Sequence, residues 1–473
     1  MDQNFITKDF ILYSKSAKEL YHNYAKNMPI IDYHSHLPPD QIANDIKFEN
    51  ITQIWLYGDH YKWRLMRAYG INEQYITGNK NDFEKFKAWA ETVPYTIRNP
   101  SYHWSHLELK NYFGINDRVL NPNSAEYIYK KCNELLQTDD FSVKNLLRKF
   151  NVKLVCTTDD PTSNLEYHKK LKEEKFEIKI LPTFRPDKGM AVETPKIFNE
   201  WVDNLETIAN TTIDNYDTYI SAIKERHDIF HELGCRISDH GLETILAEDY
   251  SQSEISTIFK KIRTGNGLEN NEIVKFKSAM MIEFALMDHG KNWTQMLHIG
   301  AMRNNNSRLF KMLGPDSGFD SIGESEIARS LSKFLDNLDN DDKLPKTIIF
   351  NLNPRDNGLI ASMIGNFQDG SIPGKIQFGH AWWFLDTKLG MTNQINALSD
   401  MGMLSKFVGM VTDSRSFLSY PRHEYFRRIL CNILGEEIDK GELPNDLDLI
   451  GNIVQDICYN NAKNYFGIDL VWY

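Results

Sequence analysis

Short apolar runs rich in β-branched residues recur along this chain and alternate with helical patterns, and this alternation limits the fold more than any other feature. Each run is apolar on both faces, as in strands buried within a helix-covered parallel sheet. Eight such units favour an α/β fold closed into a (β/α)8 TIM barrel. The eight runs are 29–34, 152–158, 178–184, 235–239, 295–300, 347–353, 375–380 and 407–413.

Two connections between these runs are too long for simple helical crossovers. The first, 37–151, is rich in Trp, Tyr and Phe, and we expect it to form a mostly helical inserted subdomain. Residues 1–36 should then hold an N-terminal helix and the first barrel strand. Residues 152–473 should hold the rest of a distorted barrel, with a second helical insertion at 185–234.

One helix is predicted with particular clarity. Residues 271–290 repeat apolar side chains at spacings of three and four, and Gly290 stands where a C-cap glycine is expected. A doubly wound open sheet is the alternative fold. It lacks its usual phosphate loop, since no G-x-G-x-x-G or G-x-x-x-x-G-K follows any run.

Charge and composition narrow the possible partners. The formal net charge is -11, with no cluster of Lys and Arg of the kind that binds nucleic acid, so we expect no nucleic-acid partner. The 5 cysteines are far apart and form no C-x-x-C pair, so they indicate neither a zinc ribbon nor a disulfide framework, and a reducing compartment is favoured. The chain shows no signal peptide and no apolar run near the ~18 residues of a spanning helix. We therefore expect a cytoplasmic protein without membrane contact.

Polar or ionisable residues follow every predicted strand. In parallel barrels the functional groups gather at the carboxyl ends of the strands, because the loops there converge on the barrel mouth. Turns also favour Asp and Asn, but imidazole or guanidinium at six of eight ends is unusual for turns alone. In strand order the residues are His34 and His36, Thr158 and Asp159, Arg185 and Asp187, Asp239 and His240, His298, Asn351 and Asn353, His380 and Trp382, and Asp413 and Arg415.

The H-x-H pair at the first strand end has the spacing of a metal site. Residues i and i+2 of a strand point to the same side, so His34 and His36 can converge on one ion. Asp413 is the best placed third ligand if the eighth strand closes beside the first. The alternatives are hydrogen-bonded turn histidines, and an aspartate that caps the helix expected after it.

Seven motifs together resemble the uronate (glucuronate) isomerase family of the amidohydrolase superfamily, from about residue 30 to the C-terminus. They are DYHSHLPP (32–39), GDHYKWRLMRAYG (58–70), LPTFRPDK (181–188), SDHG (238–241), QMLHIGAMRNNN (295–306), HAWWFLD (380–386) and TDSRSFLSYPRHEYFRRILC (412–431).

The resemblance implies conversion of D-glucuronate to D-fructuronate and of D-galacturonate to D-tagaturonate. It also implies one divalent metal ion, usually zinc, on His34, His36 and Asp413, and a homo-oligomer such as a trimer. No lysine ends the fourth strand and no histidine ends the sixth, which favours one metal over the two of many related hydrolases. The positions that the family places around the hexuronate substrate match His60, Tyr61, Arg185, His298, Trp382 and Arg415.

An aldose–ketose isomerisation suggests roles for these residues. The proton on C2 must leave and one must return to C1, through an enediol. Asp413 could combine metal ligation with proton abstraction, and Tyr61 or His60 could exchange protons with the hydroxyls. Arg185 or Arg415 could hold the substrate carboxylate by paired hydrogen bonds.

Several of these residues also have structural readings. His60 and Tyr61 could pack the inserted helices, His298 could be a satisfied core histidine, and Asp239 could orient a site group or cap a turn. Arg415 could form a surface ion pair. In an extended segment only one of two adjacent tryptophans can face the sugar, and we expect this to be Trp382.

Two other functions compete with the isomerase. A mononuclear metallohydrolase would use metal-bound water on an ester, lactone or amide. A sugar-acid-binding protein without turnover would keep the barrel but lose the chemistry.

Overall fold

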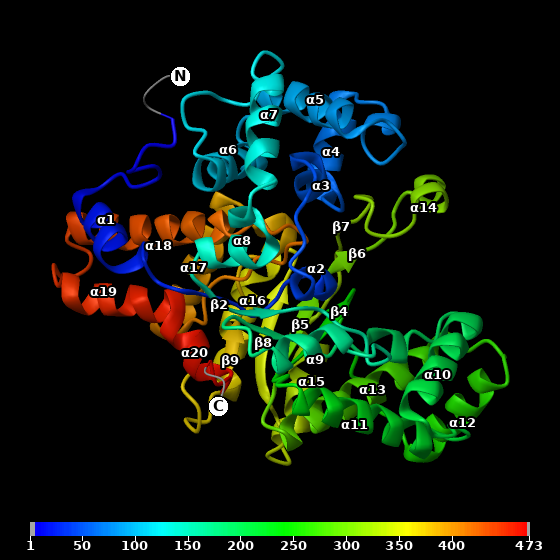
Figure 1. Ribbon diagram of the computed structural model, residues 1–473. Helices are drawn as coiled ribbons and strands as arrows, with labels where there is room; N and C mark the ends of the chain where they lie inside the picture. The colour runs from blue at the N-terminus through cyan, green and yellow to red at the C-terminus, as the bar shows by residue number, and fades with distance from the viewer. Residues whose placement is uncertain (1–4, 471–473) are drawn as a thin grey trace.

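The computed structural model describes residues 5–470, and its parallel strands form two sheets (Figure 1). The first sheet has the order β1-β2-β3 and the second β4-β5-β8-β9, and every neighbouring pair in them is parallel. The prediction of strands in the first seven apolar runs is therefore confirmed. The strands are β1 (Ile30–Asp32), β2 (Val152–Cys156), β3 (Lys179–Leu181), β4 (Ile237–Leu242), β5 (Thr294–Ile299), β8 (Lys346–Asn351) and β9 (Ile376–Phe378).

The two sheets meet at Phe184, three residues after β3. Phe184 makes parallel bridges to Asp159 on one side and to Ser238 of β4 on the other. Its N–H donates to Ile237, and its carbonyl accepts from Asp239 at 2.9 Å. Parallel pairing therefore continues from β1 to β9 through this residue, and the chain is an α/β protein with parallel sheets.

The predicted eighth strand does not form. Residues 407–413 lie beside β1 without strand geometry, because Gly409 and Asp413 have φ values of 81° and 46° that interrupt an extended chain. The N–H of Asp413 still donates to the His34 carbonyl at 3.1 Å. The N–H of Thr412, however, donates to the buried carboxylate of Asp32 at 2.9 Å, where a regular strand would use a carbonyl.

Between β1 and β2 the chain is helical, and Figure 1 shows α3 to α7 above the strands. Asn81 and Asn99 accept backbone N–H groups at the starts of α5 and α6, as N-cap residues do. The apolar faces of this segment share one hydrophobic cluster with Ile30 and Val152 of the first sheet. The helices are α2 (Pro39–Ala43), α3 (Ile51–Leu56), α4 (His60–Tyr69), α5 (Asp82–Thr92), α6 (Pro100–Phe113), α7 (Ala125–Leu136) and α8 (Val143–Lys149).

Helices also precede β1 and follow the later strands. The first is α1 (Lys15–Leu20), which continues into a π-helical turn at Tyr21–Ala25. The region 185–234 contains α10 and α11. The others are α9 (Glu166–Glu173), α10 (Pro195–Ala209), α11 (Tyr216–Glu232), α12 (Gln252–Arg263), α13 (Asn270–Gly290), α15 (Ala328–Asp339), α16 (Asn357–Met363), α17 (Lys388–Met401), α18 (Pro421–Lys440), α19 (Leu447–Gln455) and α20 (Asn461–Tyr465).

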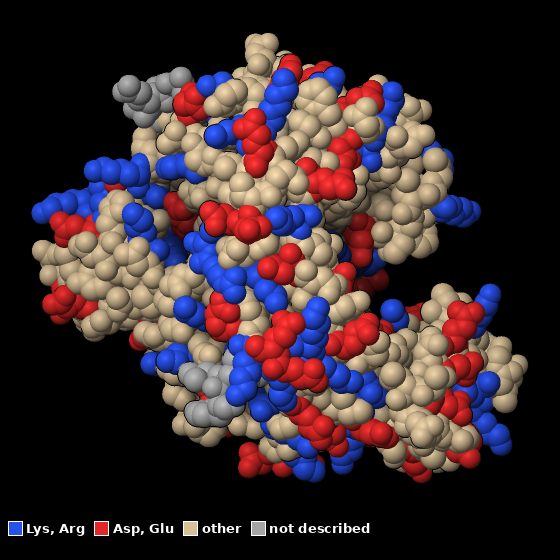
Figure 2. All heavy atoms as spheres, in the orientation of Figure 1, with Lys and Arg blue, Asp and Glu red and all other residues tan. Residues whose placement is uncertain are grey.

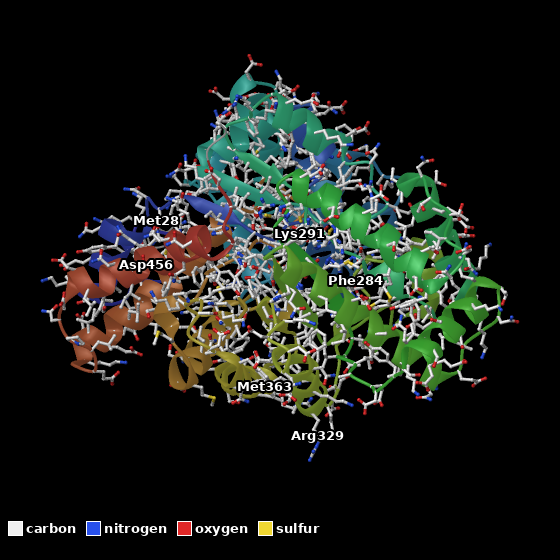
Figure 3. The ribbon with its side chains drawn as sticks, turned by 90° about the horizontal axis from the view of Figure 1, so that it is seen from below. Met28, Phe284, Lys291, Arg329, Met363 and Asp456 are labelled. Carbon is white, nitrogen blue, oxygen red and sulfur yellow. The ribbon has the colours of Figure 1, made fainter. Side chains whose placement is uncertain are left out.

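The helix predicted at 271–290 is confirmed as α13, but Gly290 is not its C-cap. Gly290 is the last helical residue, Lys291 is the C-cap, and the left-handed residue after them is Asn292 at φ 54°. Figure 3, seen from below, marks Phe284 on this helix and Lys291 just beyond it. Phe284 is buried, as the apolar spacing of the helix requires.

A small antiparallel hairpin follows β5 and was not expected from the sequence. It pairs β6 (Ala301–Met302) with β7 (Ser321–Ile322) and encloses α14 (Ser307–Leu313). Two arginines of α4 hold its return arm: Arg64 donates to the carbonyls of Gly318 and Asp320, and Arg67 to that of Ser317. The hairpin is therefore fastened to the helical insertion.

Two further expectations concern the whole chain. All five cysteines are free thiols, so the expected absence of a disulfide framework holds. From residue 5 to residue 470, the structure contains no helix with the length and apolar character that a membrane crossing requires.

The bond between Asp32 and Thr412 is expected to stabilise the join between the two ends of the chain. Replacing Thr412 by Val keeps the side-chain shape but removes the hydroxyl that donates to Asp32 at 2.6 Å. We expect Thr412→Val to lower the free energy of unfolding by about 1–3 kcal/mol, because a buried carboxylate oxygen loses its donor. Urea unfolding measures this change.

Thr92→Val is the matched control for that experiment. Thr92 is equally buried, but its hydroxyl donates only to Ala88 within α5. Its loss leaves no buried carboxylate unpaired, so the cost should be clearly smaller. An equal loss of unfolding free energy in the two variants would show that the bond to Asp32 stabilises the fold no more than an ordinary buried hydroxyl bond.

Candidate functional site

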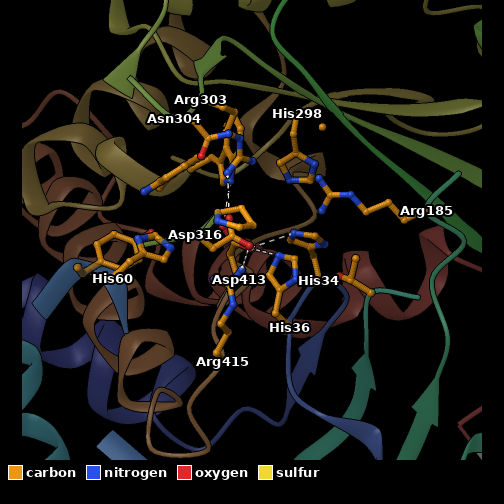
Figure 4. Close-up of a pocket in the computed structure, with 16 residues that line it drawn as sticks. His34, His36, His60, Arg185, His298, Arg303, Asn304, Asp316, Asp413 and Arg415 are labelled. Atoms are coloured by element: carbon orange, nitrogen blue, oxygen red, sulfur yellow. Dashed lines mark hydrogen bonds and ion pairs between the residues drawn. The ribbon is translucent and has the colours of Figure 1, made fainter. Parts of the chain in front are cut away.

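A pocket of about 440 Å³ opens at the carboxyl ends of the strands (Figure 4). The ends of β1, β5 and the segment 407–413 supply its floor, α4 supplies one wall, and the hairpin after β5 lies over it. Ten residues were given a metal, catalytic or substrate role from the sequence, and all of them except Asp239 line this pocket. The nine lining residues are His34, His36, His60, Tyr61, Arg185, His298, Trp382, Asp413 and Arg415.

His34, His36 and Asp413 form the centre of the pocket. The Nε2 atoms of both histidines lie 3.1 Å from the same oxygen, Oδ1 of Asp413. Ligand atoms that each stand roughly 2.1 Å from one ion are roughly 3.0–3.4 Å apart at octahedral or tetrahedral angles. The three side chains thus fit a metal ion, and they make up a buried His/Asp cluster that could bind one.

Burial and the charges of its neighbours set the ionisation of each member of this cluster. Burial alone would raise the pKa of Asp413, but hydrogen bonds from His34 and His36 bring it well below the ordinary value. Burial lowers the pKa of His36 to about 4, so its imidazole is neutral at pH 7. Burial also opposes the charged form of His34, but Asp239 and Asp413 outweigh it and raise the pKa of His34.

Asp413 does not cap the following helix. That helix, α18, begins at Pro421 with Tyr420 as its N-cap residue. Oδ2 of Asp413 instead accepts a hydrogen bond from Trp382 Nε1 at 3.0 Å. One carboxylate oxygen therefore faces the histidines, and the other is directed by an indole.

Asp239 lies behind the pocket lining and is fully buried. Its Oδ1 lies 2.7 Å from Nδ1 of His298, and its Oδ2 lies 3.1 Å from the Arg185 guanidinium. Burial would raise the pKa of Asp239, but Arg185 and the histidines bring it well below the ordinary value. Asp239 thus stays ionised and orients two lining residues, whereas Nε2 of His298 keeps no partner within the described structure.

His60 and Tyr61 form the first turn of α4. Asp59 caps this helix by accepting the N–H of Lys62, which fixes both aromatic side chains against the pocket. Burial and then the charge of Arg415 lower the pKa of His60. Burial and then Asp413 raise the pKa of Tyr61 well above its ordinary value. At neutral pH the site therefore holds a neutral imidazole and a protonated phenol side by side.

Both adjacent tryptophans border the pocket, so the expectation that Trp383 must pack elsewhere is wrong. The alternation of side chains applies only to an extended chain. Trp383 has a φ of 50° and begins a short 3-10 turn, Trp383–Leu385, which brings its indole to the same cavity as Trp382.

Sequence reasoning missed three polar lining residues: Arg303, Asn304 and Asp316. Arg303 and Asn304 lie in the motif after the fifth strand and could have been found by reading four residues further. The sequence around Asp316 gave no indication of a site residue, because it is the hairpin after β5 that brings this side chain over the pocket. Its carboxylate lies 3.3 Å from Arg415 and 3.5 Å from Arg303, and Figure 4 shows it above Asp413.

The chain is similar to known proteins along almost its whole length. The family model described as glucuronate isomerase matches residues 1–466. A uronate isomerase of Cellvibrio japonicus is 59% identical over 464 residues, 98% of each chain. One of Bacteroides fragilis is 58% identical over 466 residues, 98% of this chain and 99% of that protein.

Solved structures extend the comparison. The crystal structure of a uronate isomerase from Thermotoga maritima has a TM-score of 0.92 at 35% identity, covering 98% of this chain and 99% of that one. A putative metal-dependent hydrolase from Lactobacillus casei has a TM-score of 0.53 at 13% identity and shares the fold alone. With full-length agreement in sequence and structure, the chain belongs to the glucuronate (uronate) isomerase family.

Proposed function

We propose that this uronate isomerase interconverts D-glucuronate with D-fructuronate, and D-galacturonate with D-tagaturonate, by moving a proton between C2 and C1. Family membership supports the reaction and the hexuronate substrate. The observation that carries the proposal is the division of the Asp413 carboxylate: Oδ1 faces His34 and His36, while Oδ2 accepts a hydrogen bond from Trp382.

We infer that His34, His36 and Asp413 hold one divalent cation. Two imidazoles and a carboxylate are a ligand set that suits zinc, which is our first candidate. A cation bound there would supply positive charge to the sugar oxygens near the floor of the pocket. The 3.1 Å distances from Oδ1 of Asp413 to Nε2 of each histidine support this assignment.

In this proposal Asp413 removes the C2 proton. It is ionised at neutral pH, and its Oδ2 is oriented by Trp382 without being enclosed by the histidines. Tyr61 is a protonated phenol and His60 a neutral imidazole, so they can give and take the protons of the sugar hydroxyls. At neutral pH the site thus contains both a base and a proton donor.

We propose Arg415 as the main contact of the substrate carboxylate. Arg185 already faces two carboxylates, Asp187 at 3.0 Å and Asp239 at 3.1 Å. Arg415 faces only Asp316, which is half exposed and 3.3 Å away. A guanidinium with weaker existing partners gains more from a new carboxylate, so Arg415, with Arg303 beside Asp316, is the better candidate.

We further infer that the two sheets and residues 407–413 make a distorted (β/α)8 barrel. The Asp413 N–H donates to the His34 carbonyl just beyond β1, and the Thr412 N–H donates to the Asp32 carboxylate at the end of β1. On the other side, Gln377 of β9 donates its side-chain amide to the carbonyl of Lys406, just before this segment. We also propose that the chain divides into an N-terminal part with the first strand (1–36), a helical insertion (37–151) and the rest of the barrel (152–473). The homo-oligomer implied by the resemblance stays a prediction, which sedimentation would test.

Substitution of Asp413 tests the proposed base. We expect Asp413→Asn to reduce the turnover of D-glucuronate at least ~100-fold, the usual weight of general-base catalysis. Elemental analysis of the parent enzyme should find about one metal ion per chain, and His36→Asn should lose most of it. Ketose formation and metal content are measured on the same preparations.

Asp249→Asn is the control for those variants, since Asp249 is exposed and pairs only with Lys333. It should change neither turnover nor metal content. Full activity in Asp413→Asn would contradict the assignment of the base. Turnover of esters or lactones without ketose formation would point to a hydrolase instead.

Substitution of Arg415 tests the carboxylate contact. Losing a charge-assisted hydrogen bond costs about 1.5–3 kcal/mol, which corresponds to a roughly 10- to 100-fold rise in KM for Arg415→Met. Arg355→Met is the control, because Arg355 is an exposed arginine paired with Glu324 outside the pocket. An unchanged KM in Arg415→Met, with a raised KM in Arg185→Met, would reverse the assignment.

Asp316 should compete with the substrate for the same arginine. We expect Asp316→Asn to lower the KM for D-glucuronate severalfold, since the amide keeps the size of the side chain but no longer neutralises Arg415. Steady-state kinetics at two salt concentrations measure the effect, which should shrink at high salt. A higher KM would show that Asp316 supports the pocket and does not compete.

A further inference from the structure

Another pocket, of about 610 Å³, lies at the opposite ends of the strands from the uronate site. It borders Met28 and Asn151, which precede β1 and β2, and its walls come from α6, α8 and α18. Figure 2 shows Lys and Arg side chains gathered around a recess in the left half of the view, where α1, α8 and α18 lie in Figure 1. Nothing in the proposed isomerisation uses this pocket, which we call the basal pocket.

The basal pocket is strongly cationic in a chain of net charge -11. Its lining contains one carboxylate, Glu424, against six lysines and arginines. These are Lys8, Lys26, Lys110, Lys149, Arg427 and Arg428.

Most of this positive charge has no counter-charge. Arg428 pairs with Glu424 at 2.8 Å, but none of the other five lies within 4.0 Å of a carboxylate in the part of the chain that the structure describes. Arg427 is buried, and among residues 5–470 its two terminal nitrogens donate only to the carbonyls of Met28 and Pro29. A buried guanidinium bound only to neutral groups leaves its charge uncompensated.

Mutual repulsion accompanies this crowding. Burial, with the charges of Arg428 and Lys26, lowers the pKa of Lys110 despite the nearby Glu424. Exposed lysines alone would be an ordinary solvated surface. Arg427 and Arg428, however, are each only 4% exposed, so positive charge is also buried here.

Two buried polar groups complete the lining. The hydroxyl of Tyr420 and Nε2 of His423 have no hydrogen-bond partner in the described structure, and the two residues are 1% and 4% exposed. Such groups are costly to leave unpaired. Both residues belong to the lining of the basal pocket.

We infer that the basal pocket binds a phosphate group. Its cations come from several directions, so they suit a tetrahedral dianion with acceptor oxygens on every side better than a planar monocarboxylate with two. Lysine binds phosphate as a point charge. The same geometry makes the pocket unsuitable as a second uronate site. Its volume also admits a small phosphate monoester.

Calorimetric titration of the metal-loaded enzyme tests the inference, with inorganic phosphate, sulfate, glucose 6-phosphate and acetate at constant ionic strength. We expect the three tetrahedral anions to bind and acetate not to bind. Tighter binding of glucose 6-phosphate than of phosphate identifies a monoester as the ligand, and equal binding identifies free phosphate. Saturating D-glucuronate should displace none of them, because the two pockets are separate.

The variant K26E/K149E should weaken phosphate binding at least 10-fold. Both lysines are exposed, so the protein should fold, and its turnover of D-glucuronate should be unchanged. The control K224E/K260E changes the net charge equally on α11 and α12, and should bind phosphate within twofold of the parent.

Three results would overturn the inference. One is the absence of phosphate binding at millimolar concentration, and another is equal weakening in both double variants, which would indicate a diffuse field. The third is a change of sedimentation in K26E/K149E without phosphate binding to the parent, which would assign the lysines to an interface between copies of this chain.

Discussion

One carboxylate oxygen shared by two histidines is the contact on which the candidate site depends. Oδ1 of Asp413 lies 3.1 Å from both His34 and His36, although the histidines and the aspartate are near opposite ends of the chain. Asp32 maintains this contact by binding both the N–H and the hydroxyl of Thr412, 380 residues away. The fold therefore positions the candidate site residues by joining β1 to residues 407–413, which do not form a strand.

The charges around this contact are divided in a way that suits proton transfer. Asp239 contacts both Arg185 and His298. It therefore balances buried positive charge and orients these two lining side chains. Asp413 stays ionised, Tyr61 stays protonated, and burial favours neutral His60. Arg415 and Arg303 share the half-exposed Asp316, and Arg303 also faces the buried Asp320 at 3.5 Å, so Arg415 keeps the least compensated positive charge at the pocket mouth for an anionic sugar.

The sequence predicted the regular part of the fold well. Seven strands and the helix α13 formed where apolar spacing indicated them, because these elements bury local runs of side chains in a repeating geometry. The eighth run was apolar enough to be buried but not extended, since Gly409 and Asp413 turn the backbone. The hairpin over the pocket was missed because Arg64 and Arg67, more than 240 residues earlier, hold its return arm.

By itself the sequence determined which side chains stand at the strand ends, and hence seven of the nine predicted residues around the pocket, because strand direction and register follow from local pattern; His60 and Tyr61, on α4, came from the family resemblance. Only the tertiary structure decided their neighbours. It placed Asp239 behind His298, both tryptophans on one cavity, and Asp316 between two arginines. Such contacts join residues far apart in the chain, and no local periodicity records which distant groups meet.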